Sequence, residues 1–289
     1  MKNNEGNVTV HKVLVVGCNG MLGADIMTLL KRDADFDAVG IDLPDIEITK
    51  QSSIKGVFKG VKPQVVVNCA AYTDVDGCEN NRDLAFSVNG EGPGHLARAA
   101  GKIGASLIHI STDFVFDGTK LSLYVEEDIP NPISAYGESK LFGERSVIEQ
   151  TDAFAIFRTA WLYGHHGRNF VGIIQSLAAD KPEIRAVTDQ MGSPTYSVHL
   201  AKGIIAGIKK NIRGLYHLTN SGCCTRYEWV RKILELSGLE TKLLTAKAVD
   251  FPRPAARPSN SALDCSKFSQ ATGHEMPSWE KGLEAYFAA

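Results

Sequence analysis

The stretch Lys12-Val13-Leu14-Val15-Val16-Gly17-Cys18-Asn19-Gly20-Met21-Leu22-Gly23 decides the fold class of this chain. Its apolar, largely β-branched beginning is typical of a buried parallel strand. The glycines then follow the spacing G-x-x-G-x-x-G. Gly17 allows the tight turn, Gly20 lets the backbone approach a pyrophosphate, and Gly23 lets the next helix pack on the sheet. Because the helix that begins at Met21 offers free N–H groups and a positive dipole end, the pattern favours a dinucleotide site over a turn that binds nothing.

Strand-like and helix-like segments alternate after this turn, which predicts an α/β fold with a doubly wound, Rossmann-like parallel sheet. Strands are expected at residues 12–16, 38–41, 64–68, 106–110, 154–158 and 214–218, and helices at 21–31, 54–58, 84–100, 139–150, 198–210 and 226–237. Sheets of this kind bind ligands at the carboxyl ends of their strands. Residues 17–23, Asp42, 69–73 and 111–113 all fall at such ends.

The irregular second part of the chain predicts a smaller, C-terminal substrate-binding lobe. We expect a dinucleotide-binding domain at residues 1–165 with a return segment at 188–222, and the lobe at 166–187 and 223–289. Residues 251–258 contain three prolines and two arginines, so they are expected to form an extended loop.

Composition indicates an ordinary globular protein. Among 289 residues, 44% are hydrophobic and 22% are charged, which is enough for a substantial core. A net charge of −2 gives no reason to expect a nucleic-acid or membrane partner. The polar start of the chain resembles no secretory signal, and the six cysteines form no C-x-x-C pair. We therefore expect a cytoplasmic protein without disulfides, in which Cys18 and Cys69 are small buried thiols.

Thr112, Tyr136 and Lys140 are the candidate catalytic residues. Tyr136 and Lys140 lie four apart, hence on one face of a helix. A nearby cation lowers a tyrosine pKa, which would make Tyr136 a general acid near neutral pH. Thr112 would stabilise alkoxide charge on a substrate carbonyl. A Tyr-x-x-x-Lys spacing also arises by chance, and it is the position after the strand at 106–110 that favours the chemical interpretation.

Asp42 ends the second strand, where a carboxylate hydrogen-bonds an adenosine ribose. A carboxylate repels a 2′-phosphate, so this position favours NADH over NADPH. The alternative is a surface aspartate, with Lys31 or Arg32 reaching a phosphate.

Other residues have two interpretations each. Trp161 either faces a sugar or belongs to the core, and Arg253 and Arg257 are either surface charges or phosphate ligands. His165-His166 lacks a further ligand at metal spacing, so a solvated loop is expected there. Asn89 is expected to support helix geometry.

The chain resembles the extended short-chain dehydrogenase/reductases, and among them the dTDP-4-dehydrorhamnose reductase family, from about Lys12 to the C-terminal helix. The segments that carry the resemblance are Asn68-Cys69-Ala70-Ala71-Tyr72-Thr73-Asp74-Val75-Asp76, Ser111-Thr112-Asp113-Phe114-Val115-Phe116-Asp117-Gly118, Tyr136-Gly137-Glu138-Ser139-Lys140, Arg158-Thr159-Ala160-Trp161-Leu162-Tyr163-Gly164, Asp189-Gln190-Met191-Gly192-Ser193-Pro194-Thr195, and Arg257-Pro258 through Leu263-Asp264. Glu47 and Phe114 depart mildly from the family, which usually has aspartate and tyrosine there.

The resemblance implies reduction of the C4 ketone of dTDP-4-dehydro-L-rhamnose to dTDP-L-rhamnose, a polysaccharide precursor, with NADPH or NADH as hydride donor. The cofactor residues that it implies are Gly17, Gly20, Met21, Leu22, Gly23, Asp42, Glu47, Ile48, Ala71, Tyr72, Thr73, Tyr136 and Lys140. The substrate residues that it implies are Thr112, Asp113, Trp161, Asn169, Phe170 and, for the nucleotide diphosphate, Arg257.

Some relatives bind magnesium through glutamates at a dimer interface. Those glutamates have no counterpart that the sequence identifies, so no metal residue is assigned and a homodimer is left open. Two rivals remain: a reductase of another nucleotide-linked 4-keto sugar, and a non-catalytic regulatory subunit similar to that of methionine adenosyltransferase. An intact Thr112, Tyr136 and Lys140 set argues against the second, because a binding role needs no proton donor.

Overall fold

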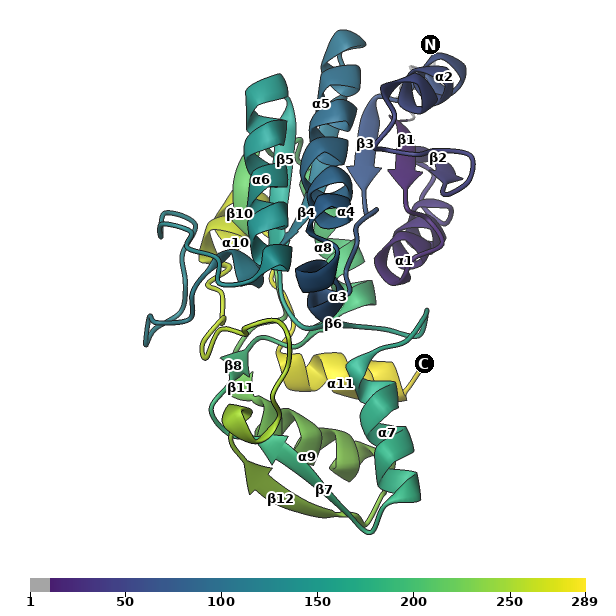
Figure 1. The fold of residues 1–289 in the computed structure, drawn as a ribbon. Coiled ribbons are helices and arrows are strands. Elements are labelled where there is room, and N and C mark those ends of the chain that lie inside the picture. The colour runs from purple at the N-terminus through teal and green to yellow at the C-terminus, as the bar shows by residue number, and fades with distance from the viewer. Residues whose placement is uncertain (1–10) are drawn as a thin grey trace, which may run out of the picture.

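A six-stranded parallel sheet forms the centre of the computed structural model, which describes residues 11–289 (Figure 1). The strands are β1 (His11–Val16), β2 (Phe36–Ile41), β3 (Val65–Asn68), β4 (Ser106–Thr112), β5 (Phe154–Thr159) and β10 (Gly214–His217). Their order is β10-β5-β4-β3-β1-β2. The chain leaves β1 toward β2 on one side and places β3 on the other side. The strand order therefore reverses between β1 and β3, which is where such sheets bind ligands.

Helices cover both faces of the sheet, as the strand sequences require. Those on one face are α1 (Met21–Leu30), α8 (Ser197–Lys209) and α10 (Ser266–Thr272), and those on the other are α2 (Gln51–Val61), α5 (Gly92–Lys102) and α6 (Ala135–Gln150). Successive side chains of β1 alternate between the two layers. Val13 and Val15 pack with α1 and α8, whereas Leu14 and Val16 pack with α2 and α5.

The lobe packs its own core below the sheet (Figure 1). Its main elements are α7 (Phe170–Asp180), β7 (Glu183–Val187), α9 (Arg226–Ser237), β12 (Lys242–Ala246) and α11 (Trp279–Phe287). β7 and β12 form a parallel pair, and Trp229 is fully buried at the centre of the cluster. Helix α10 lies with the sheet, because Phe268 belongs to the core of α1 and α8. The division into two domains otherwise stays a prediction.

Short elements join these parts. They are α3 (Val75–Asn80), α4 (Arg82–Ala85), the π-helical η1 (Phe86–Glu91), the 3-10 turns η2 (Asp113–Val115) and η3 (Ala248–Asp250), and the two-residue strands β6 (Leu162–Tyr163), β8 (Met191–Gly192), β9 (Thr195–Tyr196) and β11 (Cys224–Thr225). Apart from the helix expected at residues 84–100, the predicted strands and helices of the sheet domain and of α9 are confirmed, most of them within two or three residues at each end.

The continuous helix expected at residues 84–100 is wrong, because the π-helical turn η1 interrupts it. Asn89, within that turn, is fully buried. Its side chain accepts a hydrogen bond from the Tyr72 backbone nitrogen at 2.8 Å and donates to the Tyr72 carbonyl oxygen at 2.9 Å. The extra residue of a π-turn directs this side chain toward the segment after β3. Asn89 thus fixes a wall of the site rather than capping a helix.

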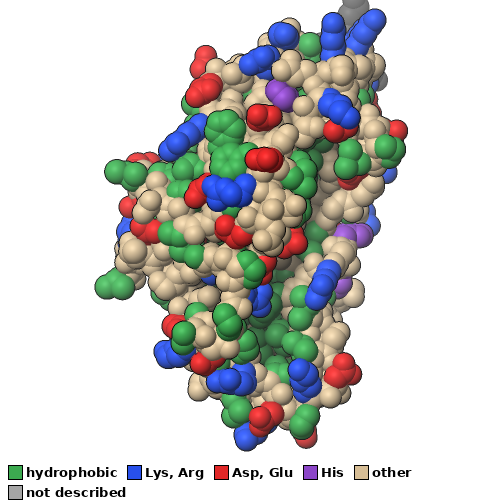
Figure 2. Space-filling model, in the orientation of Figure 1, with side chains coloured by type: hydrophobic (Ala, Val, Ile, Leu, Met, Phe, Trp, Pro, Cys, Tyr) green, Lys and Arg blue, Asp and Glu red, His purple; other side chains and the backbone are tan. Residues whose placement is uncertain are grey.

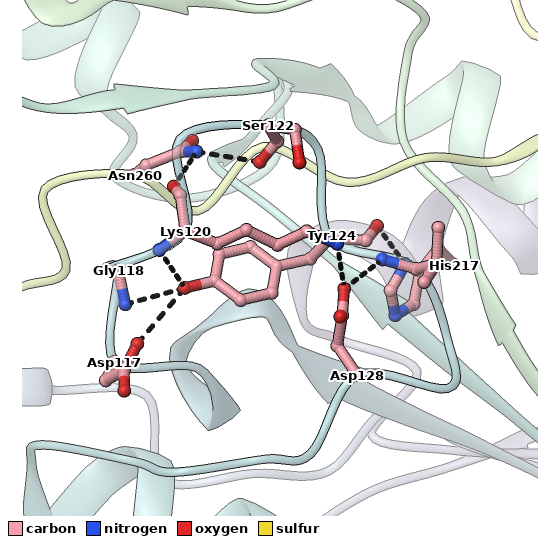
Figure 3. Close-up of polar contacts among 9 residues, drawn as sticks. Asp117, Gly118, Lys120, Ser122, Tyr124, Asp128, His217 and Asn260 are labelled. Carbon is pink, nitrogen blue, oxygen red and sulfur yellow. Dashed lines mark hydrogen bonds and ion pairs between the residues drawn. The ribbon is translucent and has the colours of Figure 1, made fainter.

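A long loop at residues 117–134 connects η2 to α6, and the hydroxyl of Tyr124 organises it (Figure 3). This hydroxyl accepts from the backbone nitrogens of Gly118 and Lys120, at 3.1 and 3.2 Å, and donates to the Asp117 carboxylate at 3.1 Å. The Asn260 amide donates to the carbonyl oxygens of Lys120 and Ser122. These bonds hold the loop in shape and tie it to the C-terminal segment around Asn260.

All six cysteines carry free thiols, so the expectation of no disulfide is confirmed. Cys18 and Cys69 are half-buried rather than fully buried, because they lie where β1 and β3 reach the ligand side of the sheet. Within residues 11–289, none of the helices combines the length and the apolar character that a membrane crossing requires.

Candidate active site

Two neighbouring cavities lie at the carboxyl ends of the strands. The glycine-turn cavity has a volume of about 390 Å³ and the tyrosine cavity of about 480 Å³. The first is lined by Val16, Gly17, Gly20, Asp42, Leu43, Ile46, Glu47, Ile48, Thr49, Cys69, Ala70, Ala71, Leu84 and Val88. Gly20, Cys69 and Ala71 line both cavities. Figure 2 shows this face of the molecule hollowed, with hydrophobic side chains along the hollow.

The glycine turn fits a dinucleotide. Gly17 has a φ of +79°, and a Cβ there would lie 2.7 Å from the Ala70 nitrogen. A Cβ on Gly23 would clash with the Gly17 carbonyl oxygen, so both positions require glycine. A Cβ on Gly20 would meet only the Gly17 oxygen, at 3.4 Å. The backbone of Gly20 is thus exposed to both cavities, and α1 begins there without a side-chain cap, which leaves its N–H groups for an anion.

Carboxylates surround the far end of the glycine-turn cavity. Asp42 accepts hydrogen bonds from the backbone nitrogens of Asn19, at 2.9 Å, and Leu43, at 2.8 Å. Glu47 lies 2.6 Å from the Lys50 ammonium, whose hydrogen bond holds the pKa of Glu47 below its usual value. The described lining of this cavity contains neither lysine nor arginine. Its charge therefore disfavours a further phosphate on a bound ribose.

Thr112 and Tyr136 come together at the tyrosine cavity, from β4 and from the first turn of α6. The Thr112 hydroxyl donates to Asp113 at 3.0 Å. Burial raises the pKa of Tyr136 above its ordinary value, although the Thr112 hydroxyl acts in the opposite direction. The expectation that Lys140 lowers this pKa is therefore wrong for the structure described here. A tyrosine that stays protonated at neutral pH is suited to donate a proton.

Lys140 lines the same cavity, one turn further along α6, and is 2% exposed. Its ammonium donates to the Ile110 carbonyl oxygen at 2.6 Å. Burial lowers the pKa of Lys140 to about 8, while the charge of Glu144 opposes this shift. Glu144 is itself held by Arg158 through two hydrogen bonds, of 2.9 and 2.7 Å, and accepts from Ser111. The lysine thus remains a cation beside the tyrosine at neutral pH.

Asp113 is a buried carboxylate at the edge of the tyrosine cavity. It is 2% exposed, and its Oδ2 atom has no hydrogen-bond partner among the described residues. Burial raises the pKa of Asp113 to about 6, against the effects of the hydroxyl groups of Ser261 and Thr112 and of the Arg226 charge. An unpartnered acceptor at this depth is costly, and a sugar hydroxyl would satisfy it.

The structure brings most of the predicted site residues to one cavity or the other. Gly17, Asp42, Glu47 and Ile48 line the glycine-turn cavity, Gly20 and Ala71 line both, and Met21, Leu22, Gly23, Thr73, Thr112, Asp113, Tyr136, Lys140 and Trp161 line the tyrosine cavity. The assigned roles themselves stay predictions. Tyr72, Asn169, Phe170 and Arg257 line neither cavity.

Tyr72 and Asn169 have structural contacts that explain their positions. Tyr72, like Tyr136, packs against the small buried cluster of Cys78, Ala85 and Ala135. Asn169 caps α7, because its side chain accepts from the Gly172 nitrogen at 3.2 Å and donates to the Gly164 oxygen at 2.7 Å. Both hydrogen-bonding ends of the Asn169 amide are therefore already in use.

Phe170 and Arg257 lie away from the cavity lining. Phe170 stacks on Trp229, with ring centroids 4.6 Å apart. Arg257 donates from both terminal nitrogens to Asp76, at 3.0 Å each, and so clamps the extended loop at 251–258 to α3. A guanidinium engaged in this bidentate pair has little capacity left for a phosphate.

Two arginines that sequence reasoning missed, Arg168 and Arg226, line the tyrosine cavity. Arg168 is exposed on the loop before α7, and Arg226 is the first residue of α9. The Thr225–Glu228 capping box could have located the start of this helix, but no local pattern shows that its first side chain faces a cavity.

The contacts of the histidine pair are with an aromatic ring and a carboxylate. His165 stacks on Tyr286 with ring centroids 4.2 Å apart, and the His166 ring nitrogen lies 3.7 Å from the Asp25 carboxylate. Both histidines are exposed, as expected for a solvated loop. Residues 11–289 contain no group of three or more histidine, cysteine or acidic side chains placed to hold a metal ion.

Comparison with known proteins agrees with this geometry. Residues 11–289 match the model of the RmlD substrate binding domain family. The spore coat polysaccharide biosynthesis protein SpsK of Bacillus subtilis is 39% identical, over 95% of this chain and 96% of the relative. The dTDP-4-keto-6-deoxy-D-glucose reductase of Streptomyces niveus is also 39% identical, over 78% of this chain and 79% of its own. The crystal structure of the Bacillus anthracis dTDP-4-dehydrorhamnose reductase in complex with NADP is 37% identical, with a TM-score of 0.93 over 96% of this chain and 99% of that one.

Proposed function

The chain belongs to the RmlD substrate binding domain family, and from that membership we propose that it reduces the C4 ketone of dTDP-4-dehydro-L-rhamnose to dTDP-L-rhamnose. The observation that carries this proposal is the meeting of Thr112, Tyr136 and Lys140 at one cavity that shares a wall with the glycine turn. The name of the Bacillus anthracis relative supplies the sugar. The product is a nucleotide sugar for polysaccharide synthesis.

The chemistry follows from the protonation states of the site. A reduced nicotinamide nucleotide, when bound, supplies the hydride. Tyr136, kept protonated by the burial that raises its pKa, donates its proton to the ketone oxygen. The Thr112 hydroxyl is a rotor that can turn from Asp113 to the same oxygen and stabilise its developing charge. Lys140, whose ammonium lines the same cavity one turn further along α6, can return a proton to Tyr136 after the transfer.

We propose that NADH is preferred over NADPH. The support is the pair of carboxylates Asp42 and Glu47 at the glycine-turn cavity, together with a described lining that contains no lysine or arginine. The Bacillus anthracis relative binds NADP, so both nucleotides must be compared. A higher kcat/KM with NADPH than with NADH would contradict this preference. Asp42→Ala is expected to reduce the ratio of kcat/KM for NADH to kcat/KM for NADPH.

We also propose a cytoplasmic reaction, which the six free thiols support. The sequence assigns no magnesium site and leaves a homodimer open, and chelation and sedimentation experiments would decide the metal requirement and the oligomeric state.

The test is loss of reduced-nicotinamide absorbance when the purified protein meets dTDP-4-dehydro-L-rhamnose, with product identification. Tyr136→Phe is expected to reduce turnover by about two to four orders of magnitude while cofactor affinity is unchanged. Near wild-type turnover in this variant would refute the assignment of Tyr136. Assays with a panel of other nucleotide-linked 4-keto sugars test the alternative that the protein reduces a different sugar. The Streptomyces niveus relative, a dTDP-4-keto-6-deoxy-D-glucose reductase, is a precedent for that alternative. Bound cofactor without turnover of any sugar would favour the regulatory role.

A further inference from the structure

Arg226 enters the tyrosine cavity from the lobe and is held there by aromatic rings. Its guanidinium carbon lies 3.4 Å from the centroid of the Trp161 ring, 5.0 Å from that of Phe170 and 5.3 Å from that of Trp229. Ring faces attract a cation, but they accept none of the hydrogen bonds of its N–H groups in the guanidinium plane. The aromatic residues therefore orient Arg226 without satisfying it.

Within residues 11–289 no hydrogen bond or ion pair involves the Arg226 guanidinium, and its nitrogens are not among the fully buried atoms without a partner, so they face the cavity that Arg226 lines. Burial lowers the pKa of Arg226 to about 9, although the charge of Asp113 opposes the shift. A cation that is partly removed from water and lacks acceptors is energetically costly. Its retention at the wall of a cavity indicates that an acceptor arrives with a ligand.

The other arginines nearby differ from Arg226. Arg168 also lines the tyrosine cavity, but it is exposed on the loop before α7 and stacks on no aromatic ring among the described residues. Arg257, the residue that the resemblance suggests for the nucleotide diphosphate, is engaged by Asp76 and lines neither cavity. Arg253 lies on the same loop, with a side chain that is 57% exposed and 3.6 Å from Asp76. Unlike Arg253 and Arg257, Arg226 lines the tyrosine cavity.

We propose that Arg226 binds the pyrophosphate of the nucleotide-linked sugar while the ketone lies at Thr112 and Tyr136, an inference that rests on the proposed function. In a pyranose, carbon 4 and the anomeric carbon lie on opposite sides of the ring. The phosphates therefore leave the ring on the side away from the ketone, and Arg226 approaches the cavity from the lobe rather than from the sheet. The planar fork of arginine matches phosphate oxygens and gains more from an anion than from a neutral hydroxyl.

The test is calorimetric binding of dTDP, which carries the pyrophosphate but no sugar, to the full-length protein with cofactor bound. We expect Arg226→Gln to weaken dTDP binding by about 10- to 100-fold. Arg226→Lys should restore part of this loss, because it keeps the charge but not the fork. Thymidine binding and NADH binding should be unchanged, and Arg253→Gln is the matched control. If Arg226→Gln does not fold, Arg226→Lys carries the test with a several-fold loss.

The possible outcomes separate this inference from the proposed function. Unchanged dTDP affinity in both Arg226 variants overturns the inference. A higher KM for the keto sugar in these variants would not rescue it, because it would show that Arg226 contacts the sugar and not the pyrophosphate. Wild-type dTDP binding that depends on Arg226, in a protein that reduces no keto sugar, supports the inference and removes the proposed function.

Discussion

Replacement of Asp113 by asparagine should stabilise the protein, and more so at high pH. The pKa of this carboxyl is raised from 3.8 to about 6, chiefly by burial. A difference of about 2 pKa units corresponds to about 3 kcal/mol of unfavourable free energy when the group is ionised in the folded state. Asparagine keeps an oxygen for the Thr112 hydroxyl and carries no charge, so it removes this cost.

The sign of the pH dependence follows from proton binding. Between about pH 4 and 6 the folded protein binds more protons at Asp113 than the unfolded chain does, so this carboxyl makes the protein less stable as pH rises. The gain in the free energy of unfolding of Asp113→Asn should therefore grow from about 1.5 kcal/mol at pH 5 to about 3 kcal/mol at pH 8. Urea unfolding followed by tryptophan fluorescence at these two pH values measures it.

Asp117→Asn is the matched control, because the pKa of Asp117 is lowered whereas that of Asp113 is raised. Backbone and side-chain hydrogen bonds, first among them that from the Thr119 nitrogen, lower the pKa of Asp117 to about 2. The stability that Asp117 contributes is present above pH 4 and is lost only as pH falls toward 2, so its variant should be destabilised equally at pH 5 and 8. An Asp113→Asn protein that is less stable than wild type at pH 8, or whose gain is the same at both pH values, would refute the reasoning.

Three further predictions concern the sheet domain. Burial lowers the pKa of Lys140 to about 8, so kcat/KM should fall as pH rises through 8. Because arginine stays charged at this pH, the decline should disappear from the pH–rate profile of Lys140→Arg. A decline that persists in this variant would show that another group causes it. Glu144→Gln should lower the free energy of unfolding by about 3–5 kcal/mol because it leaves the Arg158 charge buried without a partner, and urea titration showing a loss below 1 kcal/mol would contradict this. Gly23→Ala should lower the free energy of unfolding by about 1–3 kcal/mol and weaken cofactor binding, because its Cβ meets the Gly17 oxygen. Gly56→Ala is the control: its Cβ meets nothing within 4 Å, so it should raise the free energy of unfolding by about 0.5–1 kcal/mol. Thermal and chemical unfolding measure both.

Local sequence patterns predicted the sheet because each strand is short and largely apolar, and most strands are followed directly by glycine or a polar residue. The first strand and the turn at Gly17 to Gly23 follow directly from such a pattern. The lobe was less predictable, since helix α7 and the pair of β7 and β12 are stabilised by contacts between distant segments. The π-turn at Asn89 was not predicted either, because the side chain of Asn89 hydrogen-bonds Tyr72, which is distant in the sequence.

The candidate site could be predicted only where it lies on the sheet. Thr112 ends β4 and Tyr136 and Lys140 begin α6, so the alternation of strands and helices places all three at the carboxyl edge of the sheet. The sign of the Tyr136 pKa shift could not be predicted, because burial depends on packing around the ring. Arg226 could not be distinguished from Arg257 either, since Asp76 and Trp161 select between them through the tertiary structure.

The wall that the two cavities share has a kinetic consequence. Gly20 and Ala71 belong to both cavities, so a dinucleotide that extends along this wall becomes part of the surface that a sugar nucleotide meets. The affinity for the second ligand then includes contacts that exist only once the first is bound. We expect a compulsory order of addition, with the nicotinamide nucleotide first, and product inhibition patterns in which the oxidised dinucleotide competes with the reduced one while dTDP-L-rhamnose does not.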